Sequence, residues 1–344
     1  MEKIKGPWVR IGVHALLVLW LVYSATPFIW TLLNSIKLPR DFGTRSDKFF
    51  PFGDGLGEFS FTPVGANYAR LWLDIPAEQF APVAFGLIGL AILLIGVGAQ
   101  ANRLPIPPSS TYAIITAIIV AVVIILPNVV DMAEFYDYFL NSIVVTVATV
   151  VVSISIGCMA GYALARYSGI LGVVILFTAL AFRALPRLAF VLPYYYIGQL
   201  TNLYDTRLLL IITLVAVNQP FTIWMLRSFF MDIPREIEEA AMIDGCNRFQ
   251  SFTRVIIPIM WPGIITTSLF TVLLAYNEFL LPRILTQTNT TLPAGIVQFT
   301  SGEDAGFLPV AAAGSVSITL PIIAVIIFFQ KYLIKGLASG AVKG

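Results

Sequence analysis

Charged residues are scarce in this chain. Only 12% of its 344 residues are Asp, Glu, Lys or Arg, whereas 58% are hydrophobic, and this balance excludes an ordinary soluble domain. The chain also has a single histidine, His14, and two cysteines, Cys158 and Cys246. Cys158 lies in an apolar stretch and Cys246 in a polar one, so we expect no disulfide between them. Because His14 has no Cys, Asp or Glu at ligand spacing, we expect no metal site.

Several motifs that carry chemistry are missing. The chain has no GxxxxGK[ST] loop to bind nucleotide phosphates, no GxSxG elbow, no HExxH helix and no pair of CxxC motifs. We therefore expect it to bind no cofactor and to be no enzyme, and a membrane enzyme remains only a remote alternative. The basic residues are dispersed, so nucleic acid is not an expected partner.

What the chain has instead is long apolar runs. A helix needs about 20 apolar residues to cross a bilayer core, and these runs lack the short alternation of barrel strands. The sequence therefore predicts an all-α polytopic membrane protein in contact with lipid. The eight candidate spans lie near 11–34, 80–100, 111–129, 138–165, 170–198, 206–230, 255–281 and 309–334.

The distribution of basic residues predicts the orientation. Lys3, Lys5 and Arg10 precede the first span, which is long and has no small-residue cleavage site after it, so we interpret it as a retained anchor. With the N-terminus and, after eight crossings, the C-terminus in the cytoplasm, 12 of the 21 basic residues fall on the inside. This bias follows the positive-inside rule and favours that topology.

A charged island, residues 231–254, separates the sixth and seventh spans. Pro234 suits the first turn of a helix, and glutamates just after it favour the positive end of the helix dipole. Gly245 indicates the end of this helix, because glycine is common just after a helix C-terminus. Because Pro258 marks the entry to the next span, the segment predicts a helix, a turn and a second helix.

The first helix of the island has small and medium side chains at helical spacing, at Ile237, Ala240, Ala241 and Asp244. Small side chains let another surface approach closely, so this face predicts a docking site for a soluble partner. The alternative is an amphipathic helix that lies in the membrane interface and has no partner.

Here the sequence resembles a known family. Glu239, Ala240, Ala241 and Gly245, followed after nine residues by Val255, Ile257 and Pro258, are similar to the EAA loop of ABC importer permeases. Val255 in place of Ile and Ile257 in place of Leu are the departures. In that family the loop forms a coupling helix that docks on a separate, homodimeric ATPase, which binds ATP and Mg. The resemblance assigns the coupling role to Glu238, Glu239, Ala240, Ala241, Asp244, Gly245 and Pro258.

Two further segments resemble the carbohydrate branch of that family, of the MalG type. The first is Tyr276 to Pro282, which looks like the WNEFLWP-type segment with Tyr in place of Trp, and the second is the C-terminal tail 336–344. The resemblance implies that the tail enters the ATPase dimer interface through Gly336, Leu337, Ser339, Gly340 and Lys343. The alternative is a frayed terminus.

The resemblance also implies the partners and the mechanism. They are a second, homologous permease of the MalF type, a periplasmic solute-binding protein and a sugar substrate, moved by alternating access across a bacterial inner membrane. The same machinery could carry a polyol or glycerol phosphate instead. An ion-coupled secondary transporter is a remote alternative, because it needs no ATPase.

The chain departs from the six-span family core by an inserted hairpin. Its two extra spans fall where a periplasmic loop is expected, and the prolines of the connector 102–108 would end one helix before the next begins. A reentrant pair is the alternative to a full crossing. The expected division is an N-terminal anchor 1–36, a periplasmic loop 37–79, the hairpin 80–130, the core 138–335 and the tail 336–344.

Polar residues inside apolar spans are expensive and are therefore candidates for a substrate pathway. They are Arg183, Arg187, Tyr194, Tyr195, Asn218, Gln219, Tyr276, Asn277 and Glu278. For the tyrosines the alternative is an interfacial aromatic belt, and for the amides it is hydrogen bonding between helices. Pro186 lies between the two arginines and predicts a bend. Gly157 and Gly161 predict close helix packing.

Overall fold

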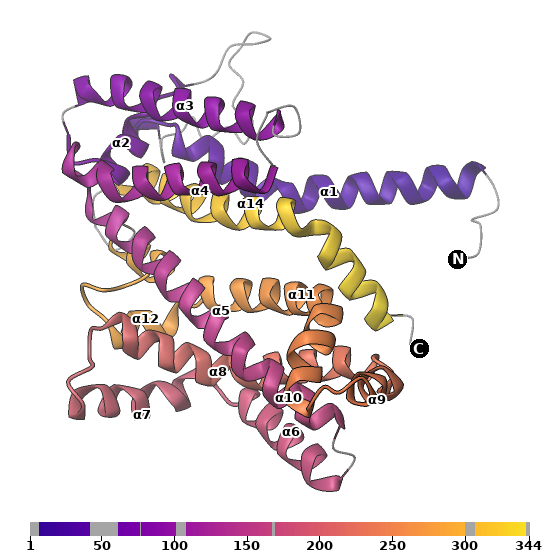
Figure 1. Cartoon of the computed structure of the whole chain (residues 1–344). Helices are drawn as coiled ribbons and strands as arrows, with labels where there is room; N and C mark the ends of the chain where they lie inside the picture. Colours follow the sequence, from indigo (N-terminus) through magenta and orange to yellow (C-terminus); the bar gives the residue numbers. More distant parts are fainter. Residues whose placement is uncertain are drawn as a thin grey trace. The chain divides into compact units, whose positions relative to one another are not determined.

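The computed structural model describes residues 7–41, 61–75, 77–100, 108–166, 169–299 and 307–341, and most of them are helical (Figure 1). Within these ranges the β pairing is limited to an isolated bridge between Leu73 and Met132. The predicted all-α fold is confirmed. The N-terminal residues 1–6, part of the predicted periplasmic loop at 42–60, the connector 101–107 and Lys343 lie outside the described residues.

Five helical segments of the described chain are long and apolar enough to cross a membrane. They belong to α1 (Pro7–Ser35), α5 (Glu134–Arg166), α8 (Arg207–Met231), α11 (Ile257–Tyr276, with the turns before it) and α14 (Phe307–Ala341). Three expected spans correspond to shorter apolar segments, within α3 (Ala77–Ala99), α4 with the short helix after it (Pro108–Ile125, Leu126–Asn128) and α6 (Ile170–Arg183). The count of eight spans stays a prediction.

The expected single helix over 170–198 is wrong. The structure breaks it into α6 and α7 (Arg187–Leu200). Pro186 precedes α7 with φ −56° and ψ 133°, an extended conformation that ends helical geometry. Proline has no N–H to donate, and it disfavours helical dihedral angles in the residue before it. The bend expected at Pro186 is therefore a complete interruption.

The expected span over 255–281 also ends early. Its helix stops at Tyr276, with Asn277 as the C-cap, and a short helix, α12 (Leu280–Leu285), follows. Before α11 the backbone forms a π-helical turn over Phe252–Ile256. α13 (Leu292–Gly295) and a 3₁₀ turn (Ile296–Phe299) then lead towards α14.

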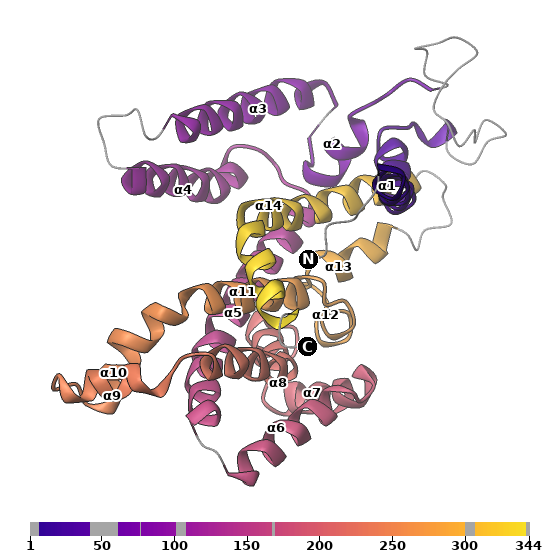
Figure 2. The same ribbon diagram turned by 90° about the vertical axis from the view of Figure 1, so that its right-hand side faces the viewer.

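The chain divides into two compact units, and unit 1 comprises Met1–Tyr136 and Ile296–Ser317. In it α3 and α4 lie side by side as the inserted hairpin (Figure 2). A short helix, α2 (Ala66–Trp72), packs near the end of α1, where the Asn67 amide donates hydrogen bonds of 2.8 Å to the carbonyls of Ser35 and Lys37. Whether the hairpin crosses the membrane stays a prediction.

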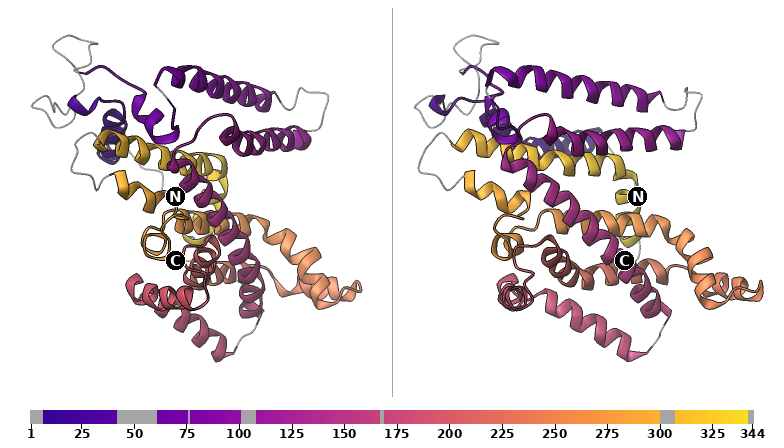
Figure 3. Two further views of the ribbon diagram at one scale, coloured as in Figure 1. Left: turned by 90° about the vertical axis from the view of Figure 1, so that its left-hand side faces the viewer. Right: turned by 60° about the vertical axis from the view of Figure 1, so that its left-hand side comes forward.

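Unit 2 comprises Asp137–Gly295 and Ile318–Gly344 and contains most of the predicted core 138–335. α8 and α11 pack against each other (Figure 3), and two apolar clusters lie towards the two ends of α8. The loop-side cluster is Cys158, Leu226, Phe230, Ile233, Phe252, Ile256, Met260 and Ile264. The far cluster is Val145, Val191, Leu209, Leu210, Leu214, Leu281 and Leu285.

Two glycines let α5 approach α8. A Cβ added at Gly157 would lie 2.8 Å from Thr222 Cγ2, and one at Gly161 would lie 3.1 Å from the backbone N of Arg227. At Gly157 a neighbouring atom would have to move, and at Gly161 the contact with the α8 backbone would be unusually tight. The close packing expected for this GxxxG pair is confirmed.

Candidate functional site

The loop between α8 and α11 folds as the sequence predicts, into a helix, a turn and a second helix. α9 (Arg235–Ile243) starts directly after Pro234, and Gly245, at φ +93°, ends the turn that follows it. A side chain at this φ would strain the backbone, so the position favours glycine. α10 (Arg248–Ser251) begins with a capping box in which Asn247 and Gln250 exchange hydrogen bonds of 2.8 and 2.9 Å.

Glu238 points into the protein. Its side chain is 11% exposed, and its Oε2 accepts a 2.8 Å hydrogen bond from Arg166 Nε at the end of α5. The Tyr162 hydroxyl, one turn earlier on α5, donates to Glu238 Oε1. Arg166 also donates to the Ile233 carbonyl, and Arg235 donates back to the Arg166 carbonyl, at 3.2 and 3.0 Å. We call this set, Tyr162, Arg166 and Glu238 with its flanking bonds, the α5–α9 tie.

The outward face of the loop differs from the predicted one. Ala241 is buried, at 7% exposure, and Ile237 packs against the loop-side cluster, so the expected face of four residues is divided. Glu239, Ala240 and Asp244 are exposed, as are two large apolar side chains, Ile243 at 86% and Phe249 at 71%. The α5–α9 tie holds Glu238 inward, on the same side as these packed residues, and leaves Glu239 facing outward.

Three of the predicted pathway residues share one cavity. Arg183, Arg187 and Tyr194 line a space of about 110 Å³ together with residues of α8. Glu278 joins them indirectly, because its Oε2 lies 2.5 Å from Arg187 Nη1. The Glu278 side chain is buried, at 8% exposure, whereas the Arg187 side chain is 37% exposed, so the ion pair is buried on one side only.

The other predicted pathway residues do not line that cavity. The Tyr276 hydroxyl donates to the Ile318 carbonyl at 3.0 Å, and the Asn277 amide donates to the Leu273 carbonyl of its own helix at 2.8 Å. Tyr195 packs edge-on against Tyr204. These three make ordinary structural contacts.

Asn218 and Gln219 lie within the helix bundle. Gln219 Nε2 donates to the Ser153 carbonyl of α5 at 3.2 Å, which supports the interhelical alternative for this residue. Asn218 is 1% exposed, and neither polar atom of its side chain has a partner among the described residues. Its function as a pathway residue stays a prediction.

A second carboxylate joins two loops at the other end of α8. Asp205 precedes α8 and accepts hydrogen bonds of 2.8, 3.1 and 3.0 Å from the backbone N–H groups of Gln287, Thr288 and Asn289. Burial by itself raises the pKa of Asp205. The hydrogen bonds from the Thr288 hydroxyl and from these N–H groups have a larger combined effect, so the pKa lies below its usual value. The predicted topology puts the loop before α8 and the loop after α12 on the outer side of the membrane. It puts the end of α5 and the loop between α8 and α11, which the α5–α9 tie joins, on the cytoplasmic side.

Sequence reasoning missed Tyr162, Arg166 and Asp205. A signal exists for the first two, since a tyrosine and an arginine four residues apart at the end of a span share one helix face next to the predicted loop. Nothing local to Asp205 indicates its partners, because they lie more than 80 residues away.

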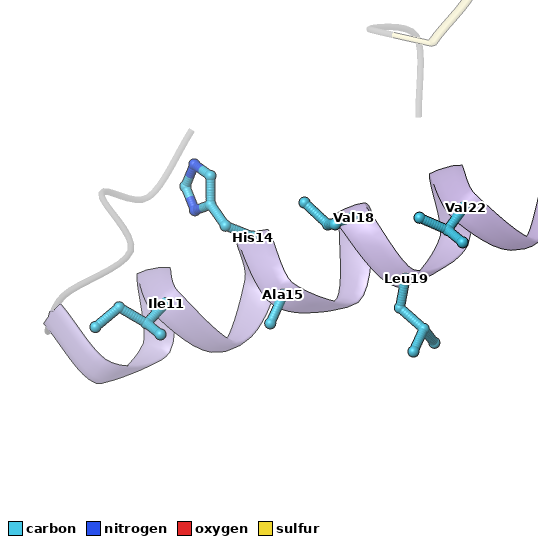
Figure 4. Close-up of a pocket in the computed structure, with 6 residues that line it drawn as sticks. All are labelled: Ile11, His14, Ala15, Val18, Leu19 and Val22. Atoms are coloured by element: carbon cyan, nitrogen blue, oxygen red, sulfur yellow. The ribbon is translucent and has the colours of Figure 1, made fainter. Parts of the chain in front are cut away.

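A larger hollow, of about 880 Å³, carries no site chemistry. Figure 4 shows that its six lining side chains all come from α1, and that His14 is the single titratable group among them. In the described part of the chain, no group of three or more His, Cys, Asp or Glu side chains could hold a metal ion.

Comparisons with known proteins identify the family of this chain. Residues 153–339 match the family described as "Binding-protein-dependent transport system inner membrane component". A probable ABC transporter permease protein, y4oR, of Sinorhizobium fredii is 36% identical over 214 residues, 62% of this chain and 76% of the relative. The trehalose transport system permease protein SugB of Mycobacterium tuberculosis is 35% identical over 216 residues, 61% of this chain and 78% of the relative.

A solved structure shares the fold. It is a chain of a bacterial ABC transporter involved in the import of the acidic polysaccharide alginate, with a TM-score of 0.62 and 18% identity, and the match covers 96% of this chain and 99% of that one. The family match begins within α5. It includes the loop between α8 and α11 with its α5–α9 tie, and the cavity beside the break between α6 and α7. The chain therefore belongs to the binding-protein-dependent transport system inner membrane components and is an ABC transporter permease.

Proposed function

We propose that the chain is the permease subunit of an ATP-driven importer that moves a sugar or oligosaccharide from a periplasmic binding protein into the cytoplasm. It would work by alternating access, together with a second, homologous permease and two identical ATPase subunits that hold ATP and Mg. The complex would lie in a bacterial inner membrane, with both ends of this chain in the cytoplasm.

The outward face of α9 and α10 is the observation that carries the coupling role. Ile243 and Phe249 expose large apolar surface at the end of a polar loop that also presents Glu239 and Ala240. Exposed apolar groups rimmed by polar ones are typical of an interaction surface. The α5–α9 tie would transmit motion at this face to α5.

The carbohydrate substrate is supported by the names of similar proteins. SugB is described as a trehalose permease, and the structural neighbour as part of an importer of alginate. Both substrates are carbohydrates, whereas no residue of the cavity by itself distinguishes a sugar from another polyol.

The coupling role is tested with the complete complex, reconstituted with its binding protein. Glu239→Lys and Gly245→Asp should each abolish uptake and binding-protein-stimulated ATP hydrolysis while the chain still inserts and assembles. Asp131→Lys, an equal charge reversal at an exposed residue outside the loop, is the control. Normal uptake in both loop variants would disprove the coupling assignment.

The same assay separates the importer from an ion-coupled secondary transporter. An importer of this class should hydrolyse ATP faster when loaded binding protein is added. Uptake that follows an ion gradient and leaves ATP hydrolysis unchanged would support the alternative.

The C-terminal tail is the second proposed ATPase contact. The backbone of α14 stays helical as far as Ala341, so most of the predicted tail continues the helix without a break. Deleting residues 336–344 should weaken ATPase assembly or its regulation. Unchanged coupled ATP hydrolysis in the truncated complex would contradict this role.

A further inference from the structure

The break between α6 and α7 brings two guanidinium groups to one small cavity. Arg183 is the last residue of α6 and Arg187 is the first of α7. Both line the cavity of about 110 Å³, together with Tyr194 and, from α8, Pro220. Each of the two short helices has 14 residues, so the break lies midway between the start of α6 and the end of α7.

The charge of this cavity is not balanced by the described residues. Arg187 is paired with Glu278 at 2.5 Å, whereas Arg183 forms no ion pair in the described part of the chain. The Arg183 guanidinium carbon lies 4.8 Å from the centre of the Phe221 ring, and its Nη1 is buried without an acceptor. Two arginines and one glutamate leave one net positive charge at the break, within the span predicted over 170–198, where an unpaired charge is expensive.

The ends of the broken helix do not supply the missing negative charge. The C-terminal end of α6 carries a partial negative charge and the N-terminal end of α7 a partial positive one, and at one break the two offset each other. The side chains therefore decide the electrostatics of the cavity, and they favour an anion.

The cavity has room for a small anionic group. Its volume of about 110 Å³ accommodates a carboxylate or a phosphate group. The planar donor fork of an arginine matches both groups, since it can donate two parallel hydrogen bonds.

We propose that Arg183 and Arg187 bind the anionic group of an acidic sugar, a carboxylate or a phosphate, as the substrate passes the break between α6 and α7. This inference rests on the proposed function and names the substrate class for it. The Arg187–Glu278 pair then holds one guanidinium in place, while Arg183 provides the uncompensated charge.

The test is uptake by the reconstituted complex, with its partner permease, ATPase and binding protein, of three labelled probes. These are digalacturonate, glucose 6-phosphate and the neutral disaccharide trehalose. We expect uptake of one acidic probe to exceed uptake of trehalose. Arg183→Gln should lower uptake of that acidic probe about 10-fold, because this is the effect of losing one charged hydrogen bond. Arg183→Lys should retain most of the uptake. Arg283→Gln, the same charge change at an exposed arginine outside the cavity, should leave it unchanged.

The outcomes separate this inference from the proposed function. If the complex transports the probes and Arg183→Gln leaves uptake of the acidic ones unaltered, the anion site is overturned and the importer stands. If Arg183→Gln instead prevents the two permeases from assembling, the missing anion is a carboxylate of the partner subunit, and the inference is wrong. If no probe is taken up and none stimulates ATP hydrolysis, the sugar assignment itself fails.

Discussion

Arg166 Nε lies 2.8 Å from Glu238 Oε2, so the last residue of α5 binds the fourth residue of α9 across 72 positions of sequence. Both side chains are largely buried, at 16% and 11% exposure. The next residue, Glu239, is exposed. Two adjacent glutamates of one motif therefore have different environments, one facing α5 and one available to a partner.

Replacing Glu238 should affect stability more than replacing Glu239. Glu238→Ala leaves Arg166 without its carboxylate, and breaking a buried pair in this way costs about 3 kcal/mol. Glu239→Ala, at an exposed position, should change the free energy of unfolding by less than about 0.5 kcal/mol. Thermal unfolding of the purified complex measures both. Equal effects of the two substitutions would contradict the inward position of Glu238.

Gly245 should accept asparagine better than alanine. Its φ of +93° is a conformation that side chains with a Cβ disfavour, at a cost of about 1–2 kcal/mol, and asparagine tolerates positive φ better than other residues. No atom lies within 4 Å of an added Cβ, so crowding does not contribute. The midpoint of thermal unfolding and the stimulated ATPase rate should both fall in the order Gly, Asn, Ala. A Gly245→Ala complex as active and as stable as wild type would rule out the strain.

Enlarging Gly161 should separate α5 from α8. Gly161→Val would push against backbone atoms of α8 that cannot rotate away, and overpacking of this kind costs about 1–3 kcal/mol. Gly96→Ala on α3 is the control, since nothing lies within 4 Å of its added Cβ and alanine favours the helix. Thermal unfolding should show a loss for the first variant and none for the second. A neutral Gly161→Val would show that the helices pack less closely than described.

Asp205 should make stability depend on pH in the acid range. Its pKa is lower in the folded protein than in the unfolded one, so its contribution is complete above the unfolded value of about 3.9 and is lost as the pH falls through the folded value. Asp205→Asn removes the charge but tolerates the positive φ of 58° at this position. The difference in unfolding temperature between wild type and variant should therefore be constant near neutral pH and shrink below about pH 4. A difference independent of pH would mean that the carboxylate charge is not stabilised there.

The apolar runs were sufficient to predict the long helices, because crossing a membrane requires about 20 apolar residues whatever the fold. They were not sufficient at Pro186, where a helix can bend and continue or stop, and the outcome depends on whether neighbours bind the freed backbone groups. The loop was predicted at the level of its helix, turn and helix, since Pro234 and Gly245 are local signals.

The orientation of the loop was beyond local signals. Glu238 and Glu239 are chemically identical and differ by about 100° around the helix axis, and the choice between them is made by Arg166 on a distant helix. The pairing in the cavity was also beyond local signals. Arg183 and Arg187 were both predicted as pathway candidates, but the difference in their pairing depends on Glu278, some 90 residues further on.

Asp205 and Glu238 bind neighbouring segments at the two ends of α8, and these contacts limit where a tag or a fluorophore can be attached to the chain. An epitope tag inserted into the turn before α8, or between α8 and α9, would separate a carboxylate from the groups that it binds. Such a fusion would perturb the very motions it was meant to record. A fluorophore attached at the exposed residue Arg283, which contributes to neither tie, is the safer design for following this permease at work.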